Sequence, residues 1–207
     1  MRGVFVTGTD TGVGKTYLAA AIASRLRGDG LRVVTCKQVL TGLDDDGPHD
    51  DEVLGGAVVA AAFGPPVSPH LAAELAGTTI DPEALLASVR DAARDADVVV
   101  VEGVGGLLVP LTPSYSVRDL AAALGLPLVV AARPGLGTIN HTLLTLEAAA
   151  ALDVRAVVLT PWPDEPSRIE RSNLETIGRL VPCATLARDA DAGALPVAEW
   201  LGDAHRR

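Results

Sequence analysis

The feature that most constrains the fold is a glycine-containing loop between a short apolar run and a helical stretch. The run Val4–Thr7 is followed by Gly8–Thr16 (GTDTGVGKT), which leads directly into a predicted helix. Such a loop wraps backbone N–H groups around phosphates at the positive end of a helix. Lys15 would then reach the β- and γ-phosphates, and the Thr16 hydroxyl would bind Mg²⁺. The usual spacing is missed by one residue, because Thr9 stands where the first glycine is expected.

The rest of the chain alternates short apolar runs with Ala- and Leu-rich stretches. Strands are predicted at Val4–Thr7, Leu31–Cys36, Val98–Val101, Leu128–Ala131 and Ala156–Thr160, and helices at Lys15–Arg27, Pro82–Arg94, Ser116–Leu124, Thr138–Leu152 and Arg168–Leu180. The strands are apolar throughout, as in a parallel sheet that is covered on both faces. We therefore expect an α/β fold with one doubly wound, mostly parallel sheet, of the P-loop NTPase type, in a single domain over residues 1–207. Asp81 is expected to cap a helix at its start, and Gly28 and Gly125 to follow helix ends.

Composition narrows the classes of function. A formal net charge of −9 argues against a general binder of nucleic acid or anionic membranes, and 3% aromatic residues leave few platforms for stacking bases. No apolar run reaches 18 residues, and the chain begins almost at once with a strand-like segment, so neither a membrane span nor a signal peptide is expected. Two cysteines, Cys36 and Cys183, are too few for a disulfide framework, which favours a cytoplasmic location.

Charged residues at predicted strand ends are further candidates for the site. Glu102 follows the run Val98–Val101 and precedes glycines, where an acidic residue near Mg²⁺ is expected. Asp50 and Asp51 offer a second carboxylate, although a solvated acidic surface explains them equally well. Lys37 follows another strand, and it is one of only two lysines beside 15 arginines. A lysine there can neutralise charge on a transferred phosphoryl group, although a surface lysine is the simpler alternative.

Five segments in order resemble the dethiobiotin synthetase family. They are Gly8–Thr16 with its displaced glycine, Cys36-Lys37 with Thr41-Gly42, Ser68-Pro69-His70, Glu102–Leu107 (EGVGGL) and Gly137–Thr142 (GTINHT). The resemblance implies a homodimer in which substrate binds near the subunit interface. It also implies a Mg²⁺- and ATP-dependent ligase of biotin biosynthesis, which closes a cyclic urea from 7,8-diaminononanoate and CO₂ through a carbamate and a carbamic–phosphoric anhydride.

The same resemblance implies roles for individual residues. Catalytic roles would fall to Lys37, Lys15 and Thr11, and Mg²⁺ would bind Thr16, Asp51 and Glu102, with Asp51 preferred over Asp50 because an apolar helix follows it. The substrate would contact Thr11, Lys37, Thr41, Thr138, Ile139 and Asn140, the last three receiving its carboxylate at a helix N-terminus across the dimer. The nucleotide and its metal would contact Gly12, Val13, Gly14, Lys15, Thr16, Tyr17, Asp51, Glu102, Gly103, Val104 and Gly105.

The chain departs from the family pattern at three points. Gln38 replaces a proline after Lys37, which is expected to shift that loop, and Val104 replaces an alanine. No asparagine that could read adenine is in register near Thr160–Pro163, and Asn173 lies too far along the chain. ATP is therefore expected to serve, with a loose preference among nucleoside triphosphates.

The alternative reading is a partitioning or regulatory P-loop ATPase without diamine chemistry. Partitioning ATPases carry a signature lysine early in the phosphate loop, where this chain has Asp10. A glutamine-hydrolysing amidotransferase would need a further domain. Four histidines (His49, His70, His141 and His205) are spaced unlike a metal cluster and are expected at the surface, and Cys36 is expected to be a buried apolar residue and not a nucleophile.

Overall fold

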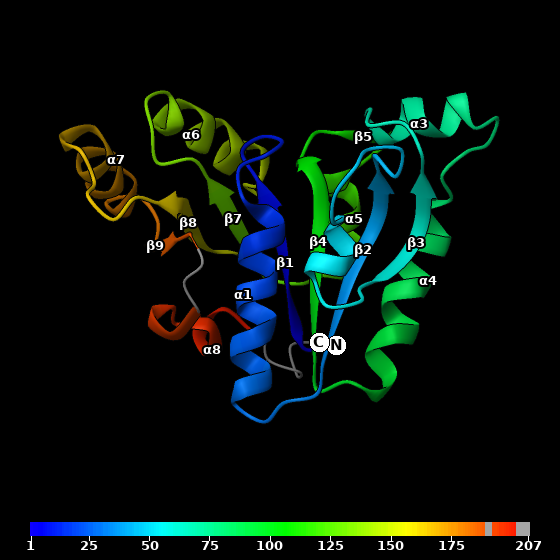
Figure 1. The fold of residues 1–207 in the computed structure, drawn as a ribbon, viewed down its shortest axis with the longest axis horizontal. Helices are drawn as coiled ribbons and strands as arrows, with labels where there is room; N and C mark the ends of the chain where they lie inside the picture. Colours follow the sequence, from blue (N-terminus) through cyan, green and yellow to red (C-terminus); the bar gives the residue numbers. More distant parts are fainter. Residues whose placement is uncertain (189–191, 202–207) are drawn as a thin grey trace.

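A parallel sheet organises the structure, a computed structural model that describes residues 1–188 and 192–201. Seven strands follow the order β3-β2-β4-β1-β7-β8-β9, and all neighbours pair in parallel (Figure 1). Their bounds are β1 (Gly3–Gly8), β2 (Val33–Thr41), β3 (Val58–Phe63), β4 (Val98–Gly106), β7 (Leu128–Ala132), β8 (Val154–Trp162) and β9 (Cys183–Ala187). A separate antiparallel pair is formed by β5 (Pro110–Thr112) and β6 (Tyr115–Ser116).

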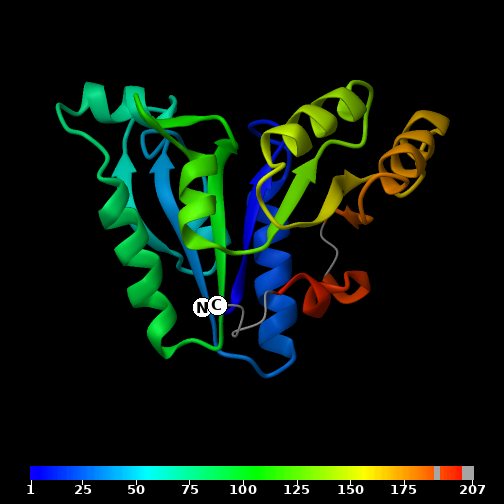
Figure 2. The ribbon, with the colours of Figure 1, turned by 180° about the vertical axis from the view of Figure 1, so that it is seen from behind.

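Helices cover both faces of the sheet. In front in Figure 1 are α1 (Lys15–Gly28), α2 (Asp50–Val53) and α8 (Val197–Trp200). In front in Figure 2 are α4 (Pro82–Ala92), α5 (Val117–Leu124) and α6 (Thr138–Ala148). The remaining helices are α3 (Pro69–Leu75), α7 (Arg168–Gly178) and two 3₁₀ turns at Ala93–Asp95 and Ala192–Ala194. A central strand is therefore buried on both sides.

The two apolar layers explain why the strands are apolar without alternation. In β1, Phe5 belongs to the layer with α4 and α5, whereas Val4 and Val6 belong to the layer with α1. All three side chains are fully buried. Because successive side chains of a strand point to opposite faces, a strand between two helical layers needs apolar residues at every position.

The fold prediction is confirmed in its class and in the five strands and five helices it named, with shifted ends. Two edge strands were missed. β3 has two valines beside three consecutive alanines, and β9 has a single β-branched residue, Thr185, beside two separated alanines, so neither is the β-branched run by which strands are recognised. Helix α3 was not predicted; it begins at Pro69, where a proline loses no hydrogen bond.

The cap predictions were two-thirds correct. Asp81 accepts a hydrogen bond from the Glu83 amide at the start of α4, and Gly125 ends α5 with φ at +63°. The prediction for Gly28 is wrong, because this residue is the last of α1, and Gly30 is the glycine beyond it with a positive φ, of +84°.

No helix among the described residues is both long and apolar enough to cross a membrane. The expectation of a single domain over residues 1–207 stays a prediction. His205 lies outside the described residues.

A matched pair of leucine truncations tests the packing of the layer beneath α4. Leu85 is 1% exposed, whereas Leu75 at the end of α3 is 62% exposed. Leu85→Ala should lower the free energy of unfolding by about 2–5 kcal/mol because a cavity remains. Leu75→Ala should change it by less than about 0.5 kcal/mol. Denaturant unfolding measures both, and equal losses would contradict the described packing.

Candidate active site

The phosphate loop takes a shape that its glycines permit. Gly14 precedes α1 with φ at +89°, and a Cβ there would lie 2.9 Å from Thr160 Cγ2. A Cβ on Gly8 would lie 2.7 Å from Val13 Cγ2. The displaced first glycine is therefore needed where it stands, because the loop folds back over it.

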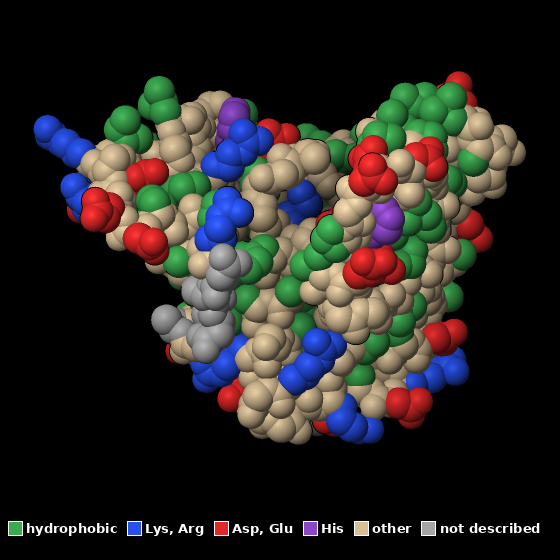
Figure 3. Space-filling view, in the orientation of Figure 1, with side chains coloured by type: hydrophobic (Ala, Val, Ile, Leu, Met, Phe, Trp, Pro, Cys, Tyr) green, Lys and Arg blue, Asp and Glu red, His purple; other side chains and the backbone are tan. Residues whose placement is uncertain are grey.

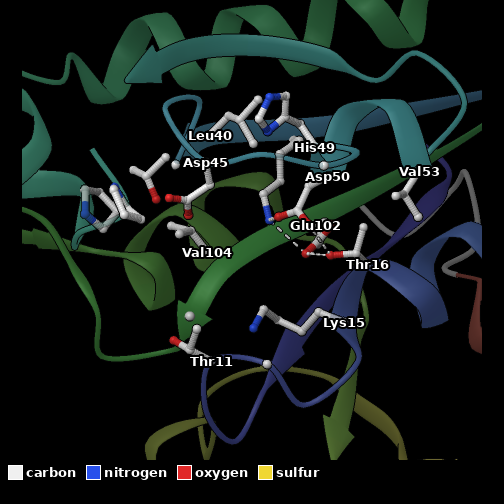
Figure 4. A pocket seen from close by; sticks show the side chains of 18 of the residues that line it. Thr11, Lys15, Thr16, Leu40, Asp45, His49, Asp50, Val53, Glu102 and Val104 are labelled. Carbon is white, nitrogen blue, oxygen red and sulfur yellow. Dashed lines mark hydrogen bonds and ion pairs between the residues drawn. The ribbon is translucent and has the colours of Figure 1, made fainter. Parts of the chain in front are cut away.

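Buried charges gather where β2 and β4 lie beside this loop. Lys37 and Glu102 are directly paired residues of the two strands, and Lys37 Nζ lies 2.8 Å from Glu102 Oε1. The same ammonium lies 2.6 Å from Asp50 Oδ2. The Thr16 hydroxyl is 2.9 Å from both Asp50 Oδ1 and Glu102 Oε1. Four residues from four elements thus form one polar cluster, drawn in Figure 4.

Burial and mutual attraction set the charge states of the cluster. Burial lowers the pKa of Lys37, but the facing carboxylates outweigh it and leave that pKa raised, so the lysine stays charged. Burial would raise the pKa of Asp50, but Lys37 outweighs it and leaves that pKa lowered. For Glu102, burial dominates and raises the pKa against the pull of Lys37. Burial also lowers the pKa of Lys15.

A cavity of about 880 Å³ opens beside the cluster. Figure 3 shows the hollow in the upper part of the molecule, with a basic side chain inside it and acidic side chains along its edge. Figure 4 shows Lys15 and Thr11 on one side, facing Asp45 and His49 on the other. Positive groups inside and a phosphate loop at the wall suit a phosphorylated ligand.

The cavity collects many of the predicted site residues. Those that line it are Thr11, Gly12, Gly14, Lys15, Thr16, Tyr17, Lys37, Thr41, Glu102, Val104 and Gly105. Val13 is instead a core residue, 1% exposed, and a Cβ on Gly103 would press on Phe5 and Val117. Thr138, Ile139 and Asn140 begin α6 and do not line this cavity.

The geometry brings Asp50, and not the preferred Asp51, into the polar cluster. Asp50 contacts both Thr16 and Lys37 and lines the cavity, whereas Asp51 does not line it. Asp50 is the first residue of α2, after the extended His49. Neighbouring residues of a helix point about 100° apart, so only one of two adjacent carboxylates can face the cluster.

Some lining residues were not predicted. They are Leu40, Asp45, Asp46, Gly47, Pro48, His49, Val53, Pro66, Val67, Ser68, Pro69 and Val109. His49 is only half-buried and lines the cavity, although it was expected to be a plain surface residue. The Ser68-Pro69 pair was noticed as a motif but given no place. Gln38, where a loop shift was expected, lies within β2, which runs on to Thr41.

Comparison with known proteins now assigns the family. A model described as an AAA domain matches residues 2–189. The chain is 42% identical to the "ATP-dependent dethiobiotin synthetase BioD" of Mycobacterium avium, over 97% of this chain and 92% of the relative. It is also 42% identical to the protein of that name from Anaeromyxobacter dehalogenans, covering 92% of each.

The chain belongs to the ATP-dependent dethiobiotin synthetase family. This confirms the resemblance inferred from its motifs.

Comparison with solved structures concerns the fold. A ParA family ATPase from Chlorobium tepidum aligns with a TM-score of 0.60 at 16% identity, over 95% of this chain and 89% of that one. The septum site-determining protein MinD from Pyrococcus horikoshii aligns with a TM-score of 0.54 at 14% identity, over 91% and 82%. At such low identity the likeness concerns the fold alone, which is confirmed as the P-loop α/β type.

Both cysteines should be inert in the folded protein. Burial raises the pKa of Cys36 to about 12 and that of Cys183 to about 11. Little thiolate, the reactive form, is present at about pH 8. A thiol-specific reagent should label neither cysteine of the native protein rapidly and both after denaturation. Fast native labelling of Cys36, located by mass spectrometry, would contradict its burial.

Proposed function

We propose that this protein is an ATP-dependent dethiobiotin synthetase, a ligase of biotin biosynthesis that converts 7,8-diaminononanoate, CO₂ and ATP into dethiobiotin, ADP and phosphate. The observation that carries the proposal is the pair of ammonium groups in one cavity. Lys15 and Lys37, the only lysines, both line it beside the phosphate loop. Family membership supplies the reaction for which this charge distribution is suited.

The reaction needs charge neutralisation more than covalent catalysis. One amine of the diamine attacks CO₂, forms a C–N bond and loses a proton, which gives a carbamate. A carbamate oxygen then attacks the γ-phosphorus of ATP and ADP departs. The second amine attacks the carbonyl carbon of this mixed anhydride, the C–O bond to phosphate breaks and a second proton is lost.

The two lysines divide this work between them. Lys15, at the start of α1, faces the place of the β- and γ-phosphates. Lys37 is fixed by Glu102 and Asp50, so its ammonium is positioned before substrate arrives. Such preorganised charge can stabilise both the carbamate and the phosphoryl group without reorganisation. Thr11 and Thr41, which line the same cavity, supply hydroxyls near the diamine and its carbamate.

The donor set of the cluster fits Mg²⁺. Thr16, Asp50 and Glu102 offer hard oxygen atoms, and the buried Glu102 Oε2 has no hydrogen-bond partner among the described residues. A Mg²⁺ ion held by these residues would complete its coordination shell with phosphate oxygens and water. When bound, Mg²⁺ would neutralise charge on the nucleotide phosphates.

Asp50 and Asp51 provide a matched test of the metal site. Asp50→Asn should weaken Mg²⁺-dependent nucleotide binding by at least about tenfold, as expected when a metal-site residue is lost. Asp51→Asn should change it by less than about twofold, because Asp51 does not line the cavity. Calorimetric titration of nucleotide with and without Mg²⁺ measures both, and a larger effect at Asp51 would reverse the assignment.

The nucleobase is expected to be selected loosely. Asn173 Nδ2 donates to the Pro134 and Gly135 carbonyls, at 2.9 and 3.1 Å, so these contacts already engage its amide. No asparagine is in register near Thr160–Pro163. ATP therefore serves as substrate, and other nucleoside triphosphates are accepted to a measurable degree.

A homodimer would complete the substrate site. The apolar side chains Leu108, Leu136 and Leu144 are 61%, 91% and 62% exposed. Leu108 and Leu144 line a second hollow between α6 and the phosphate loop. Exposed apolar patches of this kind mark interfaces. Thr138, Ile139 and Asn140 lie outside their own chain's main cavity, so they would receive the substrate carboxylate in the site of the partner subunit. A cytoplasmic location completes the proposal, which involves neither membrane nor nucleic acid.

The decisive test is phosphate release from Mg·ATP and bicarbonate, with and without 7,8-diaminononanoate. Release should require the diamine, and mass spectrometry should show the closed urea. Lys37→Gln should lower kcat by about 10²–10³-fold, because a preorganised charge is lost.

Two controls accompany this assay. Nucleotide affinity and thermal unfolding of Lys37→Gln separate a catalytic loss from unfolding, since the change leaves two carboxylates facing each other without their cation. Phosphate release that is indifferent to the diamine would instead favour a partitioning or regulatory ATPase.

A further inference from the structure

Residues 133–137 (Arg-Pro-Gly-Leu-Gly) connect β7 to α6 and are held from two sides; we call them the bridging segment. On one side stands Asn173 of α7, which is 6% exposed and donates to the Pro134 and Gly135 carbonyls. On the other side, Arg133 Nη2 lies 2.7 Å from Asp10 Oδ2 and 3.2 Å from the Thr11 carbonyl oxygen. Neither Asn173 nor Arg133 has a role in the reaction as described so far.

The contact of Asn173 leads directly to the start of α6. The Gly135 carbonyl that accepts from Asn173 also accepts from the Thr138 amide, at 3.3 Å. One carbonyl therefore joins a buried side chain of α7 to the first residue of α6. A buried amide with such partners has one favoured orientation, because an unmade hydrogen bond there is costly.

The contact of Arg133 leads to the phosphate loop. Asp10 Oδ1 accepts from the Thr11 amide at 2.7 Å, and the Asp10 carbonyl accepts from Lys15 Nζ at 3.0 Å. Arg133 and Asp10 are 58% and 52% exposed, so their ion pair by itself contributes little stability. Its effect is geometric, because the guanidinium binds two adjacent residues of the turn that carries Thr11, at the Asp10 carboxylate and the Thr11 carbonyl.

We propose that Asn173 and Arg133 are positioning residues, which make the bridging segment a rigid connection between the turn at Thr11 and the start of α6. This rests on the proposed function, in which Thr11 contacts the diamine and Thr138–Asn140 receive its carboxylate in the partner's site. In the dimer, one substrate would contact Thr11 of one subunit and Thr138–Asn140 of the other, so the connection sets the spacing between these two contacts together with the dimer interface. It thus contributes to the chain length of diamine that the assembled enzyme accepts.

The test measures exchange of single amides in the full chain without substrate. Asn173→Leu replaces the amide with an apolar side chain of similar size and so removes the donor. It should speed exchange of the Thr138 amide by about tenfold. It should also speed exchange of the Thr11 amide, which it does not touch, by about threefold or more. Arg133→Gln should speed exchange of the Thr11 amide more than that of the Thr138 amide. Arg133→Lys should retain part of the protection of the Thr11 amide that Arg133→Gln loses.

Two control variants separate positioning from general loss of stability. Ile177→Val truncates a core residue of α7 one turn beyond Asn173, and Arg32→Gln removes an exposed Arg–Asp pair distant from the segment. Neither should change exchange at Thr11 or Thr138 beyond its effect on global unfolding. If Asn173→Leu leaves Thr11 unchanged, or the controls reproduce its pattern, the connection does not exist.

Kinetics then tests the link to substrate. Both positioning variants should raise the KM for 7,8-diaminononanoate by about fivefold or more while changing the KM for ATP less than twofold. They should also lower the ratio of kcat/KM for this diamine to kcat/KM for homologues one methylene shorter or longer. Altered exchange with unaltered diamine KM and preference would overturn the substrate role. A wild-type enzyme inactive with every diamine would overturn the proposed function alone, since the exchange result does not depend on it.

Discussion

The site depends on the ion pair between Lys37 and Glu102, which the sheet register creates. The two residues are partners on adjacent strands, and each is almost completely buried. Burying either charge without its partner would cost more free energy than the ion pair contributes. Loss of one residue therefore leaves the other as an uncompensated buried charge. Glu102 Oε2 has no hydrogen-bond partner among the described residues. The position of this carboxylate is fixed by strand β4.

The strand order turns this pair into a complete site. β4 lies between β2 and β1, so the acid of β4 has the lysine of β2 on one side and the phosphate loop after β1 on the other. Since all strands run in parallel, their following loops meet at one edge, where Thr16 and Asp50 join the pair. Residues distant in sequence thus form a single charged cluster.

The sequence was sufficient for the fold class, the phosphate loop and the candidates Lys37 and Glu102, because each depends on local pattern. It could not pair Lys37 with Glu102, since register is a long-range property. Nor could it choose between Asp50 and Asp51, because that depends on the residue at which a four-residue helix begins. The edge strands β3 and β9 were missed because alanines carry no strand preference.

The contacts of Asn173 could not be predicted from the sequence for a different reason. The sequence placed this residue in a helix, which is confirmed, and predicted that it lies too far along the chain to read a base, which stays a prediction. Its partners are carbonyls 38 and 39 positions earlier, in a segment whose course no local pattern specifies. A loop at the carboxyl edge of a parallel sheet leaves main-chain carbonyls without strand partners, and buried ones require a donor. The side-chain amide of Asn173 meets this need and is thereby engaged with the main chain, which supports the loose nucleobase selection proposed above.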